Sequence, residues 1–386
     1  MEISWFNLLL MALFSLGHAA LMIGIVNRLH GLPLAEGLLH AARKLHDLLI
    51  AAFPVSLLWF FGVHGPGLMY GGAWWKLPPV MLAYLAVCGA TAAGLPVVAL
   101  KRRWARPIAQ QTLQRSTRHD IAGRLGYRPV GHGPHRRLLA VPGNEAFQLE
   151  VTEKHFRLPR LPPAWHGLSI LHLTDLHFTG AIERAYFEEV IDAGQKLNAE
   201  LIVFTGDLLD QAELIDWIPD TLGRLTAPLG CYFVLGNHDW LLGDQSPTRR
   251  LLGELGWRDA AGRELSVEYR GRSLLIAGTE LPWIGTHPEL VADPGEAFRI
   301  LLSHTPDNIA WARRHGVDLM LSGHNHGGQV RLPLFGPVYS PSTFGCQYAA
   351  GVFWESPTLL HVSRGVSGWH PLRLGCPPEI TSIVLD

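Results

Sequence analysis

The sequence predicts an α/β domain with mixed β-sheets, which begins near residue 146 and follows an N-terminal region of membrane-spanning helices. Two observations predict this order. Long apolar stretches occur only in the first 100 residues, and short apolar runs that alternate with helical patterns fill the second half of the chain. Apolar stretches of about 20 residues can cross a bilayer, whereas runs of about 4–8 residues are typical of buried strands.

The composition of the 386-residue chain excludes several classes of protein. Charged residues make up 17% and hydrophobic residues 48%, which is not the composition of a disordered chain. The formal net charge is -1, so there is no overall basic field, and we expect no nucleic-acid partner. The four cysteines are scattered without a C-x-x-C pair, which excludes a disulfide framework and a zinc knuckle.

Three apolar segments predict three membrane spans, at residues 3–26, 45–63 and 77–100. Their lengths approach or exceed what is needed to cross about 30 Å of hydrocarbon. For the first segment the alternative is a cleaved signal peptide, but it lacks the basic start and the small-residue cleavage site of such peptides. For the second, which Pro54 interrupts, the alternative is an interfacial or buried helix.

The distribution of basic residues predicts how these spans are oriented. Ten Lys or Arg residues lie between positions 101 and 137, against the single acid Asp120, whereas only Lys76 lies between the second and third spans. Because Lys and Arg gather in cytoplasmic loops, we expect a multi-pass protein of the cell membrane with its N-terminus outside and its catalytic part in the cytoplasm. Residues 101–145 are predicted to form a basic juxtamembrane linker that is attracted to anionic lipid.

Short apolar runs predict the strands of the domain at 146–386. Several are apolar at consecutive positions, as strands covered on both faces are. The predicted strands are residues 168–174, 201–205, 231–235, 273–279, 298–303 and 317–322. The predicted helices are residues 183–197, 215–225, 248–255 and 307–315.

Polar side chains with metal-binding atoms directly follow five of these strands. They belong to the motifs D-L-H, G-D, G-N-H-D, a single His and G-H-N-H, and the candidates are Asp175, His177, Asp207, Asn237, His238, Asp239, His304, His324 and His326. Each motif alone is typical of a turn or a helix cap. In α/β folds, however, ligands gather at the carboxyl ends of strands, so this succession favours one shared site.

The chemistry of these side chains suits two divalent cations. Carboxylates, imidazoles and an amide oxygen are suitable ligands for Mn, Fe, Zn, Co or Ni. Two such cations about 3.5–4 Å apart can hold a hydroxide and clamp the attacking and leaving oxygens of a phosphoryl displacement. With two carboxylates and the hydroxide, the centre keeps a charge of about +1, which attracts an anionic phosphate ester.

These motifs resemble those of the calcineurin-like metallophosphoesterases over roughly residues 146–386. The later stretches GGQVRLPLFGPVYSPS, VSRGVSG and PPEI are similar to a membrane-anchored microbial branch that includes phosphodiesterases related to UDP-2,3-diacylglucosamine pyrophosphatases. The resemblance implies a four-layer αββα sandwich of two mixed β-sheets flanked by helices. It also implies a metal-dependent phosphoric ester hydrolase for a phosphodiester or pyrophosphate bond, in a lipid-linked or nucleotide-lipid substrate, with a metal-bridging hydroxide as the attacking group.

The same resemblance assigns roles by matched position. One metal would be held by Asp175, His177, Asp207 and His326, and the other by Asp207, Asn237, His304 and His324. His238 would be the general acid or a charge stabiliser, with Asp239 orienting it. Arg364 in the S-R-G-V-S-G stretch is a candidate contact to phosphate. His172 and His361 lie within strand patterns and are expected to be packed core residues.

Two other functions stay open at the level of sequence. The same centre would serve a phosphomonoesterase or phosphoprotein phosphatase, because the pocket walls and not the metal ligands select the leaving group. Alternatively, the membrane region is the working unit, as a scaffold or transporter, and the phosphoesterase-like part regulates it. The spans contain few ionisable groups, with His18 alone inside the first, which argues for an anchor.

Overall fold

A computed structural model describes residues 2–104, 107–290 and 297–386, apart from the side chain of Glu36. The chain divides into two compact units. A helical unit contains the N-terminal region up to residue 106 together with Leu332–Gly345, and an α/β unit contains Pro107–Arg331 and Cys346–Asp386.

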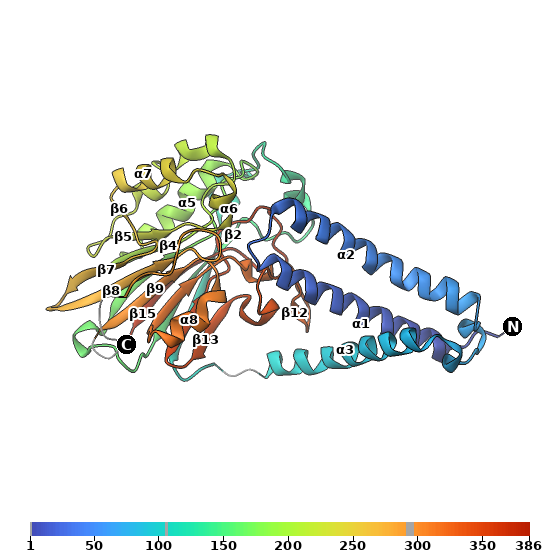
Figure 1. Cartoon of the computed structure of the whole chain (residues 1–386). Coiled ribbons are helices and arrows are strands. Elements are labelled where there is room, and N and C mark those ends of the chain that lie inside the picture. Colours follow the sequence, from blue (N-terminus) through green and yellow to red (C-terminus); the bar gives the residue numbers. More distant parts are fainter. Residues whose placement is uncertain (1, 105–106, 291–296) are drawn as a thin grey trace. The chain divides into compact units, whose positions relative to one another are not determined.

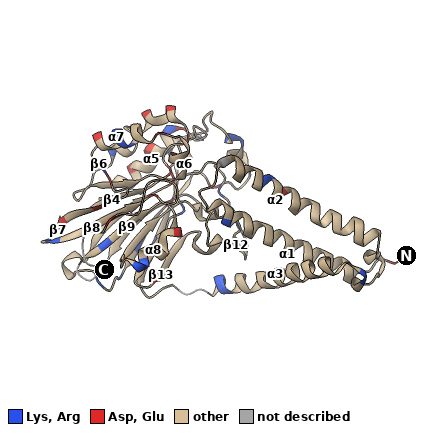
Figure 2. Ribbon diagram, in the orientation of Figure 1, with Lys and Arg blue, Asp and Glu red and all other residues tan. Residues whose placement is uncertain are grey.

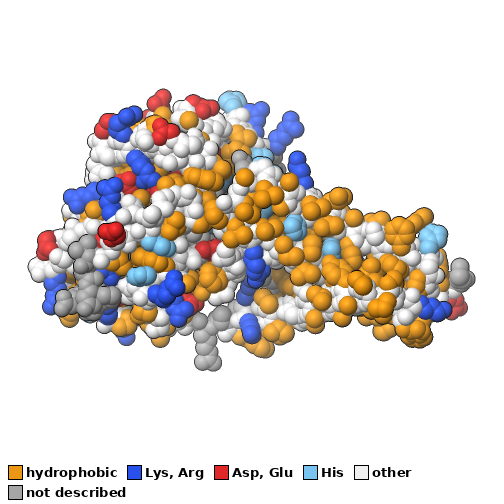
Figure 3. Space-filling view, in the orientation of Figure 1, with side chains coloured by type: hydrophobic (Ala, Val, Ile, Leu, Met, Phe, Trp, Pro, Cys, Tyr) orange, Lys and Arg blue, Asp and Glu red, His pale blue; other side chains and the backbone are white. Residues whose placement is uncertain are grey.

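Three long helices form most of the helical unit (Figure 1): α1 (Trp5–His30), α2 (Glu36–Ser56, continued by a π-helical stretch at Leu57–Val63) and α3 (Pro79–Arg103). All three are long and apolar enough to cross a membrane. Their surface is covered mostly by hydrophobic side chains (Figure 3), and few Lys and Arg lie along the helices (Figure 2). The three predicted apolar segments therefore form three helices of membrane-spanning length.

A segment distant in sequence, Leu332–Gly345, belongs to this helical unit. The side-chain amide of Asn27 donates to the carbonyl of Val338 at 3.0 Å, and Arg102 donates to the carbonyl of Pro337 at 3.2 Å. The sequence predicts one phosphoesterase domain over 146–386, a range that includes this segment. Its partners lie at the ends of α1 and α3, which the local pattern of residues does not reveal.

Two mixed β-sheets form the centre of the α/β unit. One has the strand order β1-β2-β15-β3-β4-β5-β6, and the other β13-β14-β10-β9-β8-β7. The first contains β1 (Gln111–Asp120), β2 (Gln148–Phe156), β3 (Leu168–Leu173), β4 (Leu201–Thr205), β5 (Cys231–Val234), β6 (Trp257–Asp259) and β15 (Glu379–Leu385). The second contains β7 (Glu264–Tyr269), β8 (Arg272–Thr279), β9 (Phe298–Ser303), β10 (Leu319–Ser322), β13 (Gly351–Glu355) and β14 (Thr358–Val362).

The two sheets pack face to face, and helices cover their outer faces. On β4, Leu201 and Val203 join the core between the sheets, whereas Ile202 and Phe204 face the core beneath the helices. This division follows from the alternation of side chains along a strand. The helices of this unit are α4 (Ile121–Leu125), α5 (Arg184–Gln195), α6 (Asn237–Leu241), α7 (Ser246–Glu254) and α8 (Ile309–Arg314). The sandwich of two mixed sheets with flanking helices is thus confirmed.

The predicted linker at 101–145 contains part of this sheet. Strand β1 pairs with β2 in antiparallel register, from Gln111 opposite Phe156 to Asp120 opposite Gln148. The sequence of β1 is almost entirely polar and most of its side chains are exposed, so it lacks the apolar alternation that marks a strand. Edge strands need no such alternation, and charge on them discourages pairing with other chains.

Candidate metal centre

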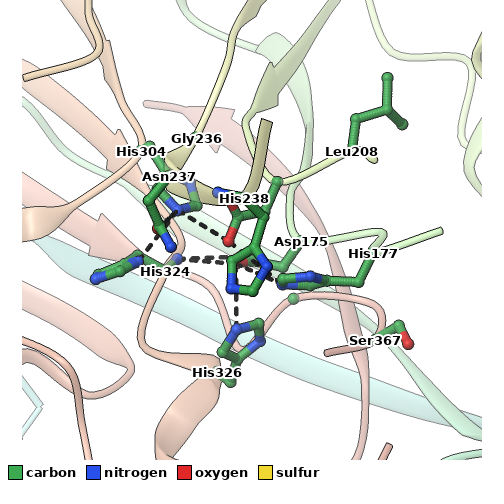
Figure 4. A network of polar contacts seen from close by, with 12 residues as sticks. Asp175, His177, Leu208, Gly236, Asn237, His238, His304, His324, His326 and Ser367 are labelled. Atoms are coloured by element: carbon green, nitrogen blue, oxygen red, sulfur yellow. Dashed lines mark hydrogen bonds and ion pairs between the residues drawn. The ribbon is translucent and has the colours of Figure 1, made fainter. Parts of the chain in front are cut away.

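Five strands carry the candidate ligands to one place. Asp175 and His177 follow β3, Asp207 follows β4 and Asn237 follows β5, and these three strands are parallel neighbours in one sheet. His304 follows β9 and the G-H-N-H motif follows β10, parallel neighbours in the other sheet. Figure 4 shows the imidazoles from both sheets pointing toward one another. The structure therefore brings together all seven residues that the sequence singled out as metal ligands.

One ligand group consists of Asp175, His177, Asp207 and His326, whose ligand atoms all lie within 4.8 Å of one another. Nε2 of His177 is 3.3 Å from Oδ2 of Asp207 and 3.9 Å from Oδ1 of Asp175. Nε2 of His326 is 3.6 Å from the same Asp175 oxygen. Two carboxylates and two imidazoles thus face a common point.

A second ligand group shares Asp207 and adds His304 and His324. Nε2 of His304 is 3.2 Å from Oδ2 of Asp207, 3.1 Å from Oδ1 of Asn237 and 3.2 Å from Nδ1 of His324. Four candidate ligand atoms therefore surround a second point, and the carboxylate of Asp207 borders both.

The buried charges of these groups favour cations. Burial and the negative charge of Asp207 raise the pKa of Asp175, although His304 opposes this. For Asp207 itself, burial is outweighed by His304 and His238, and its pKa lies well below the usual value. Nε2 of His177 is buried and has no hydrogen-bond partner among the residues that the structure describes. A buried imidazole nitrogen that faces carboxylate oxygens without a hydrogen bond fits a divalent metal, which accepts this set of donors.

The backbone at this centre is held in an uncommon conformation. Five of the seven candidates have positive φ, between 47° and 67°: Asp175, His177, Asp207, His324 and His326. Residues other than glycine rarely adopt this conformation, and it costs about 1–2 kcal/mol for each. Gly323 makes the last turn possible, because a Cβ there would lie 2.1 Å from Oγ1 of Thr174 and 2.2 Å from Oδ2 of Asp175. Such strain is typical of functional sites.

Comparison with known proteins agrees with this geometry. The family model described as calcineurin-like phosphoesterase matches residues 168–328, the range that contains all seven candidate ligands. The phosphodiesterase YaeI of Escherichia coli (strain K12) is 30% identical over 222 residues, which cover 56% of this chain and 81% of that protein. The chain belongs to the calcineurin-like phosphoesterase family. It is a metal-dependent phosphoester hydrolase.

Two further relatives are a pyrophosphatase and a protein named as transmembrane. The UDP-2,3-diacylglucosamine pyrophosphatase LpxG of Chlamydia muridarum (strain MoPn / Nigg) is 28% identical over 288 residues, or 60% of this phosphoesterase and 88% of LpxG. A transmembrane protein with metallophosphoesterase domain from Danio rerio is 29% identical over 269 residues, or 64% of this phosphoesterase and 60% of that protein. Three apolar helices of sufficient length and a relative named as a transmembrane protein both support a membrane location for this phosphoesterase.

Hydrogen bonds from the far side of the imidazole rings fix two of the candidate ligands. Nδ1 of His304 donates to the carbonyl of Thr205 at 2.7 Å, and Nδ1 of His177 lies 3.0 Å from Oδ2 of Asp210. These contacts leave Nε2 of both rings directed at the centre. Metal-binding histidines usually have such partners, which set the tautomer and the orientation of the ring.

The residue that orients His238 differs from the one that the sequence predicts. Nδ1 of His238 lies 2.5 Å from Oδ1 of Asp210, so Asp210 rather than Asp239 orients the ring. Asp239 instead accepts hydrogen bonds from the backbone amides of Leu208, Leu209 and Gly236. It therefore connects the loop after β4 to the start of α6. The sequence signal for Asp210 is a carboxylate three residues after Asp207, in the stretch G-D-L-L-D.

The negative charges around His238 act on its protonation. Although burial lowers the pKa of His238, the carboxylates of Asp207 and Asp210 outweigh it and raise this pKa to about 10. Burial also raises the pKa of Asp210, but the imidazoles of His177 and His238 lower it to about 2. Asp210 is therefore ionised and His238 protonated near neutral pH, as a group that gives a proton to a leaving oxygen has to be.

Arg364 does not fit its predicted role in phosphate binding. Its guanidinium forms ion pairs with Glu150 at 2.7 Å and with Glu379 at 3.2 Å, and its side chain is largely buried. The nearby Arg373, which the sequence did not single out, is fully buried and donates to the carbonyls of His326 and Arg364. Arg373 thus supports the loop that carries His326.

Proposed function

We propose that this phosphoesterase holds two divalent cations, one on each ligand group, and hydrolyses a phosphodiester or pyrophosphate bond. The main support for this proposal is the carboxylate of Asp207, which belongs to both ligand groups. Bound cations at these positions supply positive charge that ionises a water molecule and attracts the phosphate oxygens. The candidate ligands are Asp175, His177, Asp207, Asn237, His304, His324 and His326, with Mn, Fe, Zn, Co and Ni as the metals that suit them.

His238 has the role of proton donor to the leaving oxygen in this proposal. Its backbone amide donates to Oδ1 of Asp207 at 2.9 Å, which fixes the residue beside the shared carboxylate. Its Nδ1 contacts Asp210, so Nε2 is the atom that would face the substrate. Asp207 would also hold the cations, which would neutralise part of the negative charge that raises the pKa of His238 and so favour its role as a general acid.

The proposed substrate is a lipid-linked or nucleotide-lipid phosphate ester at the membrane. LpxG, named as a UDP-2,3-diacylglucosamine pyrophosphatase, and YaeI, named as a phosphodiesterase, support a diester or pyrophosphate bond rather than a monoester. We also propose that α1, α2 and α3 each span the membrane, with the α/β unit in the cytoplasm. The basic residues Lys101, Arg102 and Arg103 at the end of α3 support this orientation.

The activity is tested on the full chain purified in detergent with Mn²⁺. We expect turnover of bis-p-nitrophenyl phosphate and of at least one member of a panel of lipid pyrophosphates, and slower turnover of p-nitrophenyl phosphate. Asp207→Asn should lower kcat by at least 100-fold and reduce bound metal. The matched control is Asp192→Asn, which changes a half-exposed carboxylate paired with Arg224. A faster monoesterase reaction would favour a phosphomonoesterase, and no turnover of any substrate would refute the proposal.

The orientation is tested separately by labelling single cysteines. His64→Cys and Ala109→Cys, both at exposed positions, are made in a Cys346→Ser background because the other three cysteines are buried. A membrane-impermeant maleimide added to intact cells should label position 64 and not position 109. The reverse pattern would show that the α/β unit is outside.

A further inference from the structure

A surface cavity of the α/β unit, with a volume of about 460 Å³, lies outside the metal centre. It is lined by a short stretch that we call the basic loop, residues 132–138: His132, Gly133, His135, Arg136, Arg137 and Leu138 take part in the lining. The sequence contains no Asp or Glu between positions 121 and 144. The cavity is therefore lined mainly by groups that attract anions.

The backbone ties the basic loop to the loop that carries His177. The amide of Gly133 donates to the carbonyl of Gly180 at 2.8 Å, and the amide of Gly131 donates to the carbonyl of Ala181 at 2.9 Å. The approach is so close that a Cβ at Gly133 would lie 2.0 Å from the carbonyl oxygen of Thr179. The basic loop is thus fixed two to four residues from a candidate metal ligand, and it is not an independent surface feature.

A row of aromatic rings gives a second, independent connection. The ring of Trp369 lies 6.0 Å from that of His238 and 5.6 Å from that of His135, measured between ring centres. His135 in turn lies 4.3 Å from His370. Trp369 therefore neighbours both the proposed proton donor and the basic loop, and an aromatic ring in this place is of a kind that can stack on a planar group.

The basic side chains of the loop are accessible to a ligand. His132, His135, Arg136 and Arg137 are exposed, and Arg136 contacts Nδ1 of His132 at 2.8 Å. An acidic residue that comes near, Glu183, accepts a hydrogen bond from the hydroxyl of Tyr127 at 3.0 Å. One guanidinium group can donate two parallel hydrogen bonds to the oxygens of a phosphate. Phosphate is therefore the ligand best suited to two adjacent arginines.

We propose that the basic loop, which Trp369 connects to His238, is a subsite for a second phosphate-type anionic group of the substrate. The proposal rests on the function proposed above and narrows it to substrates with more than one anionic group. Trp369 would stack against a planar part of the substrate that lies between the two anionic positions. A nucleotide combines both features, a ring and a chain of phosphates.

The subsite is tested by a binding assay without metal, so that hydrolysis of the probe cannot affect the measured Kd. The full chain is placed in nanodiscs of neutral phosphatidylcholine with EDTA, and binding of the fluorescent nucleotide mant-ADP is followed by anisotropy. Wild type is compared with the double variant Arg136→Ala/Arg137→Ala, with Trp369→Leu, and with Arg250→Ala as a control arginine on the exposed face of α7. The double variant Arg136→Lys/Arg137→Lys keeps the charge but not the planar fork.

We expect the alanine pair and Trp369→Leu each to raise the Kd by about tenfold, the lysine pair to give an intermediate Kd, and Arg250→Ala to leave it within twofold. An alanine pair with the wild-type Kd would overturn the proposal, as would undetectable binding to the wild type. A second arm uses nanodiscs with 30% phosphatidylglycerol. If wild type and the alanine pair become equal there, a lipid headgroup occupies the loop and the substrate assignment is wrong.

The same preparations separate this proposal from the proposed function. Wild type is assayed with Mn²⁺ on bis-p-nitrophenyl phosphate, which carries a single charge. If it turns over while the arginine variants bind mant-ADP as tightly as wild type, only the subsite is wrong. If neither that diester nor the lipid pyrophosphates are hydrolysed, the proposed function fails, and the binding data still decide whether the loop holds an anion.

Discussion

The substitution Asp210→Asn tests how the proton donor of this phosphoesterase is held. Asp210 is buried and its two oxygens contact Nδ1 of His238 at 2.5 Å and Nδ1 of His177 at 3.0 Å. The amide has the same shape but only one accepting oxygen, so it loses either the ion pair with His238 or the charge-assisted hydrogen bond with His177. Such a bond contributes about 1.5–3 kcal/mol. Since 1.36 kcal/mol is a factor of ten in rate, we expect kcat to fall by about 10- to 150-fold.

The assay measures kcat on bis-p-nitrophenyl phosphate from pH 5 to 10, at Mn²⁺ concentrations high enough to compensate for weaker metal binding. Loss of the partner of His177 should itself lower the affinity for metal by about 10- to 100-fold, which a Mn²⁺ titration measures separately. Because Asp210 helps to raise the pKa of His238, its removal lowers that pKa. Activity that needs protonated His238 should then be lost at a lower pH than in the wild type.

Asp192→Asn is the control, since it makes the same chemical change on a carboxylate outside the centre. If Asp210→Asn keeps the wild-type kcat at saturating Mn²⁺ and the same alkaline limb, His238 is not the proton donor or Asp210 does not hold it. If only the metal affinity changes, the role of Asp210 is confined to His177.

Four further predictions concern stability and metal. Removing metal with EDTA should lower Tm, and Mn²⁺ at 100 times its Kd should restore about 2.7 kcal/mol, measured by thermal unfolding; an unchanged Tm would argue against metal at Asp207. Gly323→Ala should reduce bound metal, because the new Cβ collides with Thr174 and Asp175, whereas Gly253→Ala, which has open space around it, should leave metal content unchanged. Glu264→Ala removes the carboxylate from the fully buried Arg299 and should cost about 3–5 kcal/mol; Glu264→Leu/Arg299→Met should recover much of the loss in Tm. Although burial raises the pKa of Glu379, Lys154 and Arg364 hold it well below its ordinary value of 4.5, so its stabilising effect is present above that pH and is lost on acidification. Glu379→Gln should therefore flatten the acid side of a plot of Tm against pH, and an unchanged slope would contradict the assignment.

The strands and the candidate ligands could be predicted because their signals are local. The apolar run of β4 and the Gly206-Asp207 pair that follows it are contiguous in sequence, and the same holds for β10 and His324. A run of consecutive apolar residues identifies a strand covered on both faces, and the polar residues directly after it lie at the edge where ligands gather. The metal-binding residues are therefore found without knowing how the sheets pack.

The partners of these residues depend on packing and could not be predicted. His172 and His361 are fully buried, as expected, but the structure adds a connected row of polar groups between the sheets. Nζ of Lys154 lies 2.9 Å from Nε2 of His361, whose Nδ1 lies 3.0 Å from Nδ1 of His172. Nε2 of His172 lies 2.9 Å from Oγ1 of Thr205. Lys154 and His361 are 207 residues apart in sequence, so no local pattern connects them.

Contacts between residues that are distant in sequence also explain why the structure gives Asp239 and Arg364 roles other than the predicted ones. Asp239 follows His238 directly, but α6 turns its carboxylate toward backbone amides, while Asp210 reaches the ring from another loop. Arg364 lies in a loop whose sequence resembles that of the family. However, Glu150 from β2 and Glu379 from β15 neutralise the charge of its guanidinium. In both cases the residue type suited the predicted role, but partners that come from other parts of the chain gave the side chain a different one.

Strand β15 has a consequence for how the protein is made on the ribosome. It is parallel to β2, antiparallel to β3, and lies between them, although it follows both in sequence. Between the end of β3 at Leu173 and the start of β15 at Glu379, translation at 5–20 residues per second takes roughly 10–40 s. During that interval β2 and β3 have no central strand to join them. Nascent chains of this protein should therefore depend on chaperones and remain sensitive to protease until residue 385 has emerged.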